Sequence, residues 1–333
     1  MAFRYKDTDY IYISARVRGM ENGLVRRDCY DRMLSAEDVD SAAAYLREYG
    51  YDVAGLSASE REDVLNATLK AGLREIEKDA PDSAMFSFFR YPYDCTNAKT
   101  LIKCKARGIS AEGMLFDLGG VSPERLTECF EKKDYSCLPE HMAKATEEAI
   151  EAYATTKNPQ KIDFLLDRAC FADMAACAKE SKIPYIGQIV DARADLINFM
   201  ICLRILRMNC GDYGKVYAEE ALLEDGKIGK KKFLKAFAEG EEALIAQLDR
   251  AGYGNIASSL EAGCSLGRAE KICDNGRIEL LRRARFVTFG VEIPVAYLAA
   301  LEAQIQNIRI ILAGKEAGLD AAAISERMRD CYV

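Results

Sequence analysis

The residues that most often carry out catalysis are few in this sequence, and no motif groups them. His141 is the only histidine, so the chain has no histidine-rich metal site and no second histidine to activate a nucleophile. No two of the 12 cysteines have the C-x-x-C spacing of zinc and redox motifs, and no segment has the D-D-x-x-D pattern that binds Mg²⁺ with a diphosphate. We therefore expect no catalytic residue, no metal ligand and no cofactor.

Nucleotide-binding motifs lack the surroundings that they need. The segment Gly252–Ala257, GYGNIA, fits the pattern G-x-G-x-x-A, but in dinucleotide sites this pattern follows a strand, and residues 242–250 have a helical pattern. Gly314-Lys315 lacks both the upstream glycine and the following serine or threonine of a phosphate-binding loop. We expect GYGNIA to be a turn between helices, and we expect no nucleotide to bind directly.

Polar residues recur three positions apart within segments that are otherwise apolar. Because buried polar groups are nearly always hydrogen-bonded, we interpret these residues as hydrogen-bonding groups between packed helices rather than as catalytic carboxylates. The helix-packing polar pairs are Asp94 with Asn97, Asp195 with Asn198, and Gln304 with Asn307.

Two clusters of basic residues have a second possible use. The simpler interpretation is that they are solvated helix faces, where most charged residues lie. The alternative is a docking surface for an acidic partner, because the segment around Arg168 that matches the second cluster is not basic. The clusters consist of Lys230, Lys231, Lys232 and Lys235, and of Arg282, Arg283 and Arg285.

Length and composition limit the class of protein. A chain of 333 residues exceeds one ordinary core, and a net charge of −7 argues against general nucleic-acid binding. The cysteines lie in apolar helical runs, which favours reduced thiols acting as small core residues. The N-terminal segment has no apolar signal core, and no run approaches the roughly 18 apolar residues of a membrane span. We expect a soluble protein that does not itself cross a membrane.

Helical patterns extend over the whole chain. Alanine, leucine, glutamate, lysine and arginine are abundant, and no alternating strand is found, so the predicted class is all-α. Pro184 should begin a helix of about 25 residues. A second long helix should begin at Pro294 and end in a left-handed cap at Gly314. Its buried side should contain Leu301, Ile305, Ile308 and Leu312.

Parts of the sequence repeat at a period of roughly 100 residues. The segment Leu165–Phe171, LLDRACF, matches Leu280–Phe286, LLRRARF, and each precedes a proline that should start a helix. A fainter third copy lies near Pro92. The glycine-rich segment 113–122, with Gly119-Gly120, is the expected linker after the first copy. We predict three helical lobes, at residues 1–112, 113–210 and 211–333.

Three segments connect the chain to a known family. They are Tyr12–Arg18 with the pattern Y-x-x-A-R-V-R, Phe289–Pro294 with FGVEIP, and Asn307–Arg309 with NIR. The chain resembles, over its whole length, the C subunit of the V/A-type rotary ATP synthases, the counterpart of the d subunit in the eukaryotic vacuolar proton pump. Members usually have glutamate where this chain has Gln304. We assign that position to helix packing, so the change affects little of the expected function.

The resemblance implies three similar lobes around a pseudo-threefold axis, forming a funnel. It also implies a structural protein without catalytic or nucleotide-binding residues. In the family this protein sits on the membrane ring of proteolipid subunits and receives the central shaft, made of the D and F subunits. It is peripheral, lies on the cytoplasmic side of the membrane, and transmits torque between ATP turnover and H⁺ or Na⁺ transport. The basic clusters are our own candidates for docking, since no family binding residue is carried over.

Two other classes of function remain open at this stage. One is a stand-alone helical scaffold or interaction protein, outside any rotary complex. The other is an all-helical enzyme, which would need a deep polar pocket with clustered carboxylates. The sequence distinguishes neither H⁺ from Na⁺ nor ATP synthesis from hydrolysis.

Overall fold

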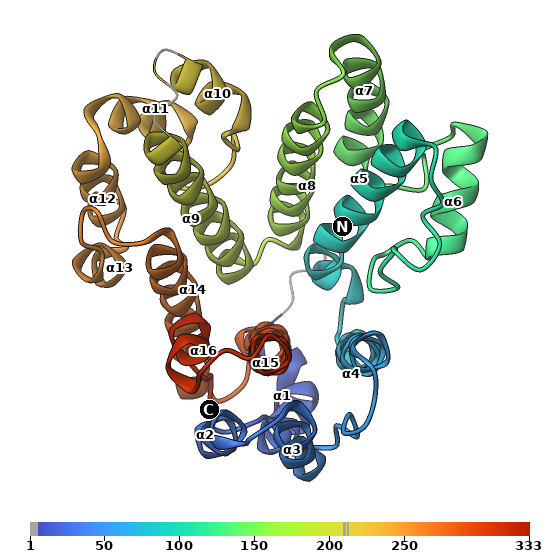
Figure 1. Cartoon of the computed structure of the whole chain (residues 1–333), viewed down its shortest axis with the longest axis vertical. Coiled ribbons are helices and arrows are strands. Elements are labelled where there is room, and N and C mark those ends of the chain that lie inside the picture. The colour runs from blue at the N-terminus through green and yellow to red at the C-terminus, as the bar shows by residue number, and fades with distance from the viewer. Residues whose placement is uncertain (1–5, 209–210, 212) are drawn as a thin grey trace. The chain divides into compact units, whose positions relative to one another are not determined.

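Helices form all the regular structure in residues 6–208, 211 and 213–333, which the structure, a computed structural model, describes (Figure 1). The predicted all-α class is confirmed, because no strand occurs in those residues. The helices group into two compact units. Unit 1 consists of the chain up to Ser83 together with Gly263–Val333, and unit 2 consists of Ala84–Ala262. The division into three lobes stays a prediction.

Unit 1 is built from both ends of the chain. Its α-helices are α1 (Ile11–Met20), α2 (Arg27–Ser35), α3 (Val39–Ala44), α4 (Ala58–Asp79), α14 (Leu266–Arg282), α15 (Glu292–Glu316) and α16 (Ala321–Arg327). Its 3-10 helices are η1 (Asp7–Tyr10), η2 (Glu21–Gly23), η3 (Tyr45–Tyr49) and η5 (Arg283–Phe286).

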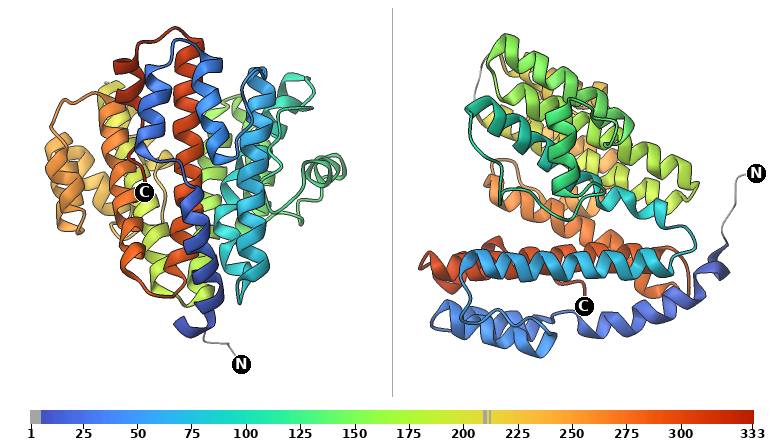
Figure 2. Two further views of the ribbon diagram at one scale, coloured as in Figure 1. Left: turned by 90° about the horizontal axis from the view of Figure 1, so that it is seen from below. Right: turned by 90° about the vertical axis from the view of Figure 1, so that its right-hand side faces the viewer.

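Helix α15 is the central helix of unit 1. It contacts α1, α3, α4, α14 and α16, and Figure 2 shows α4 running alongside it. All four residues of the predicted apolar stripe are buried, as expected for a helix that is surrounded by others. A Cβ at Gly72 of α4 would lie 2.5 Å from Cδ2 of Leu301, so this glycine lets α4 approach α15 closely.

The prediction that this helix ends at Gly314 is wrong. Helix α15 continues to Glu316, and the left-handed residue after it is Gly318, with φ +69°. Gly314 is buried within the helix, where a Cβ would lie 2.6 Å from Cγ1 of Ile324 on α16. The glycine therefore allows α16 to pack against α15. A glycine is required both for such close packing and for a left-handed cap, so the sequence alone does not distinguish the two.

Unit 2 begins with the 3-10 helix η4, whose first residue closes unit 1. Its helices are η4 (Ser83–Phe89), α5 (Tyr91–Arg107), α6 (Pro123–Lys132), α7 (Glu140–Thr156), α8 (Gln160–Ser181), α9 (Pro184–Met208), α10 (Tyr213–Ala221), α11 (Lys230–Glu239), α12 (Glu241–Arg250) and α13 (Gly254–Ser259). Helix α9 starts at Pro184 and has 25 residues, in agreement with the prediction. It contacts α8 on one side and α10, α11 and α12 on others.

The glycine-rich segment predicted as a linker lies within unit 2 and is bound to helix α5. The Gly120 N–H donates to the carboxylate of Asp94 at 2.9 Å, and a Cβ at Gly119 would overlap that carboxylate. These two glycines allow the main chain to approach Asp94 closely, and the linker between the first two lobes stays a prediction. The boundary between the units falls earlier, at Ser83.

Two expectations about the whole chain can be compared with the described residues. No disulfide joins the cysteines whose placement the structure describes, and seven of them are buried, in agreement with the interpretation of reduced thiols. No helix in the described part of the chain combines the length and the apolar composition that crossing a membrane requires.

Candidate docking surface

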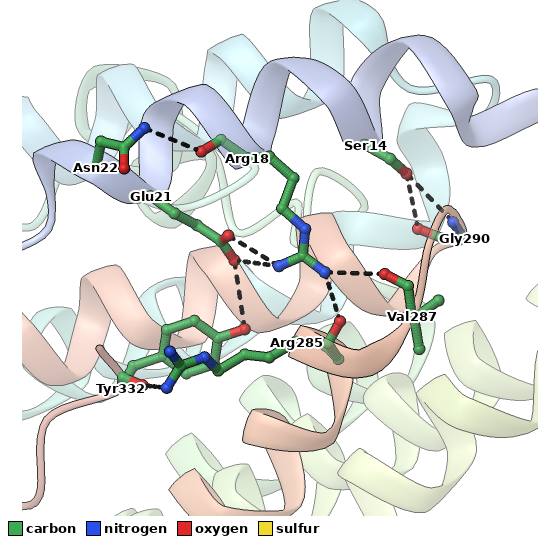
Figure 3. A network of polar contacts seen from close by, with 9 residues as sticks. Ser14, Arg18, Glu21, Asn22, Arg285, Val287, Gly290 and Tyr332 are labelled. Atoms are coloured by element: carbon green, nitrogen blue, oxygen red, sulfur yellow. Dashed lines mark hydrogen bonds and ion pairs between the residues drawn. The ribbon is translucent and has the colours of Figure 1, made fainter.

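The two most specific segments of the sequence, near residues 12–18 and 289–294, meet in unit 1. Arg18 of α1 donates from Nη2 to the carbonyl oxygen of Ala284 at 2.7 Å and to that of Val287 at 2.9 Å (Figure 3). Its Nη1 donates to both carboxylate oxygens of Glu21, at 3.0 and 2.8 Å. A guanidinium has donors in a fixed fork, so this single side chain ties α1 to the turn between η5 and α15.

Ser14, one turn earlier on α1, binds the other end of the same turn. The Gly290 N–H donates to Ser14 Oγ at 3.2 Å, and Oγ donates in turn to the Gly290 carbonyl oxygen at 3.4 Å. Both residues are buried, so these bonds satisfy main-chain groups that water does not reach. Residues 284–290 are thus held at both ends by α1.

The fixed turn leaves an aromatic side chain in solvent. Phe286 is 92% exposed, the largest exposed fraction among the large hydrophobic residues described. Arg283, three residues earlier, is exposed as well. The sequence gives no sign of this, because Phe286 aligns with Phe171, which is buried in α8. We define Arg283 and Phe286 as the docking turn.

The other two arginines of this basic cluster hold the C-terminal segment of the chain. Arg282 forms an ion pair with Glu279 at 2.8 Å and donates to the carbonyl oxygen of Cys331. Arg285 donates to the carbonyl oxygen of Tyr332 at 3.4 Å (Figure 3). Of the three predicted docking arginines, the structure therefore gives Arg282 and Arg285 a structural role as well.

The lysine cluster lies on α11 in unit 2. Lys230 forms an ion pair with Glu224 at 2.6 Å, and its side chain is only 17% exposed. Lys231, Lys232 and Lys235 lie on the same helix, and all three are exposed. These three lysines are a second candidate surface, separate from the docking turn.

The three asparagines of the polar pairs make one and the same contact. In each case the side-chain amide donates to the carbonyl oxygen of one downstream residue and accepts that same residue's N–H. We call this arrangement an asparagine clamp. The two distances are 2.8 and 2.8 Å for Asn97 with Phe116, 3.1 and 2.8 Å for Asn198 with Leu223, and 3.0 and 2.8 Å for Asn307 with Arg329.

The clamped residues lie in connecting segments, not in helices. The asparagines therefore bind main chain after a helix, whereas the sequence suggests hydrogen bonds between helices. All three asparagines are at most 1% exposed. Each clamp therefore gives hydrogen-bond partners to the N–H and the carbonyl oxygen of a residue that, because it lies outside a helix, has no helical partners for them.

The residues three positions before the clamps bind main chain too. Asp94 accepts the N–H groups of Gly120 and Val121, and Asp195 accepts the N–H of Ile228 at 3.1 Å and the hydroxyl of Tyr253 at 2.9 Å. Burial raises the pKa of Asp94 and that of Asp195 to about 6, although the N–H donors act in the opposite direction.

Gln304, the counterpart of these aspartates, has a different pair of partners. Its Oε1 accepts the N–H of Val25 at 2.6 Å, and its Nε2 donates to the hydroxyl of Tyr51 at 2.6 Å. The amide of glutamine supplies both an acceptor and a donor. A glutamate at this position could donate a hydrogen bond to the Tyr51 hydroxyl oxygen only if its carboxyl group were protonated.

Other candidate chemistry of the sequence resolves into structural contacts. His141 Nδ1 lies 2.8 Å from Asp173, which also accepts two N–H groups at the start of α7. Gly252, with φ +92°, lies in the turn between α12 and α13, so the expected turn is found at Gly252-Tyr253, whereas the rest of GYGNIA belongs to α13, which starts at Gly254. Across the described residues, no three histidine, cysteine or acidic side chains are grouped so that they could hold a metal ion.

Known proteins match the chain over almost all of its length. Residues 13–327 match the sequence profile of the family described as ATP synthase (C/AC39) subunit. The C subunit of the V-type sodium ATPase of Enterococcus hirae is 22% identical over 330 residues, covering 97% of this chain and 99% of its own. The C subunit of the A-type ATP synthase of Haloferax volcanii is 25% identical over 344 residues, covering 95% and 96%.

Proposed function

The chain belongs to the ATP synthase C/AC39 subunit family, and on that premise we propose that it is a non-catalytic part of a central stalk. In this role it couples a rotor shaft, made of the D and F subunits, to a membrane ring of proteolipid subunits. It lies as a peripheral protein on the cytoplasmic side of the membrane. Torque that passes through it links ATP turnover to H⁺ or Na⁺ transport.

One observation supports this proposal above the others. The family match runs from residue 13 to residue 327, so it includes both compact units of the chain. A match confined to one unit would point to a shared helical module instead. The predicted three-lobed funnel belongs to the same proposal.

The docking turn fits a coupling role because it is both exposed and fixed. A protein that transmits torque must present its contact residues on a stiff support, and residues 284–290 are bound at both ends by α1. Phe286 supplies apolar area to a partner and Arg283 supplies charge. Exposed aromatic and arginine side chains are the residue types that most often dominate binding energy at interfaces.

The test of the function is co-purification from the native host. The chain is tagged, membranes are solubilised gently, and the proteins recovered with it are identified and quantified. We expect the other subunits of a rotary ATPase, with about one copy of this chain per complex. Recovery of the chain alone in the soluble fraction would refute the proposal and favour the stand-alone scaffold.

A pair of variants tests the docking turn within the same experiment. Arg283→Glu with Phe286→Ser should reduce the recovery of the other subunits severalfold, because it reverses the exposed charge and removes the exposed ring. The matched control is Arg250→Glu, a charge reversal at an exposed position on α12. Equal recovery with both variants would exclude the docking turn as a contact but would leave the family role intact.

A further inference from the structure

Unit 2 has a groove at the end of α5 that none of the contacts described above fills. It has a volume of about 830 Å³ and lies between the second half of α5, residues 109–115 and α6. Its apolar lining includes Leu101, Leu115 and Phe130. A volume of this size accommodates a few large apolar side chains.

Apolar side chains are also exposed in the segment that borders the groove. Ile109, which lines it, is 50% exposed, and Met114, within the same segment, is 52% exposed. Single exposed hydrophobic residues are common on protein surfaces, but two beside an apolar groove add to one continuous apolar area. The groove can therefore bury more apolar surface than its lining alone provides.

The charged residues around the groove are mainly acidic. Glu124, Glu128 and Glu131 line it from one face of α6, because they are separated by four and three residues. Glu112 lines it from the opposite segment, and Lys105 is the only cation of the lining. Glu128 forms an ion pair with Lys132, whereas the other three glutamates have no ion pair within the described residues.

We propose that this groove binds a helical segment of another protein whose apolar face is flanked by lysine or arginine. The apolar floor takes two or three side chains on successive turns of the partner helix, and the glutamates pair with its flanking cations. An acidic rim repels phosphate groups, so a nucleotide or an anionic lipid surface does not fit the same groove. This site is distinct from the docking turn, which lies in unit 1 and is basic.

The proposal is tested by measuring the binding of a labelled peptide to the full chain with fluorescence anisotropy. The probe is a labelled synthetic helix with leucine on one face and lysine on the other. Two reference peptides have glutamate in place of lysine, or alanine in place of leucine. We expect binding of the leucine–lysine peptide only, with an affinity that falls as salt rises because exposed charges are screened.

Variants of the groove separate this site from general attraction to an acidic protein. Glu124→Lys with Glu131→Lys should weaken binding at least about tenfold, and Ile109→Glu should weaken it similarly without altering the core. The control is Glu148→Lys with Glu151→Lys, two exposed positions on α7 in the same unit. No binding of the probe, or equal weakening by the groove and control variants, would overturn the proposal. The result does not depend on the rotary complex, so it stands or falls separately from the proposed function.

Discussion

Replacing Asn198 by leucine should destabilise unit 2 through the loss of one asparagine clamp. Leucine has a similar size, so the change removes two hydrogen bonds with little change in packing volume. It leaves the N–H and the carbonyl oxygen of Leu223 without their partner, and both residues are completely or almost completely buried. Each stranded main-chain group costs about 1–3 kcal/mol. We therefore expect the free energy of unfolding to fall by about 2–6 kcal/mol.

Thermal unfolding by circular dichroism measures this loss. Because the chain has two compact units, it need not unfold in a single step, and only the transition of unit 2 should move. For a unit of this size, a loss of about 2–6 kcal/mol lowers Tm by roughly 4–24 °C. Hydrogen exchange gives a local readout, since the amide of Leu223 should lose its protection first.

A matched control isolates the clamp from the substitution itself. Asn255 is exposed on α13 in the same unit, and Asn255→Leu should leave Tm nearly unchanged. Asn198→Asp is a second comparison, because a carboxylate still accepts the Leu223 N–H but faces the Leu223 carbonyl oxygen with no proton to donate. If Asn198→Leu changed neither Tm nor the exchange of Leu223, the clamp would not be the stabilising contact that we describe.

Three further predictions concern other contacts. Burial raises the pKa of Asp94 to about 6, above the unfolded value of about 3.9, so its contribution to stability is full below about pH 4 and is lost as pH rises through about 6. Urea unfolding from about pH 4 to 7 should show a fall in the free energy of unfolding that is smaller in Asp94→Asn by up to about 3 kcal/mol, while Asp195, whose pKa is also raised to about 6, still contributes its own fall; parallel pH profiles would contradict this. Arg18→Met removes the hydrogen bonds that hold residues 284–287, so it should destabilise unit 1 by about 1–3 kcal/mol and speed hydrogen exchange at Val287. Unchanged exchange would show that Arg18 does not hold this turn in place. Gly314→Ala should lower Tm despite alanine's advantage of about 1 kcal/mol in a helix, because its Cβ meets Ile324; a higher Tm would refute the close packing.

Sequence patterns predict the long helices well because their signals are local. A proline at the start and apolar residues at three- and four-residue steps are enough to place α9 and the buried stripe of α15. The prediction fails at Gly314 because a glycine near the end of a helix fits both a cap and a close contact. Only the position of Ile324, on another helix, distinguishes the two.

The candidate site is less predictable because its contacts are not local. The sequence identifies Asn198 as a buried polar residue, but its partner is main chain 25 positions away in a connecting segment. No side-chain pattern encodes such a partner. The exposure of Phe286 escapes prediction for a related reason: its aligned counterpart Phe171 is buried, and exposure depends on how the turn is held by Arg18.

The discontinuous make-up of unit 1 has a consequence for synthesis on the ribosome. Helices α1 to α4 emerge first, but the central helix that covers them, α15, is translated only after the whole of Ala84–Ala262. Translation at about 5–20 residues per second makes this delay roughly 10 seconds or more. Unit 2 is continuous and can fold during that interval. The apolar faces of α1 and α4 meanwhile lack α15, the helix that each contacts most, so a nascent chain stalled before Glu292 should recruit chaperones through its N-terminal helices.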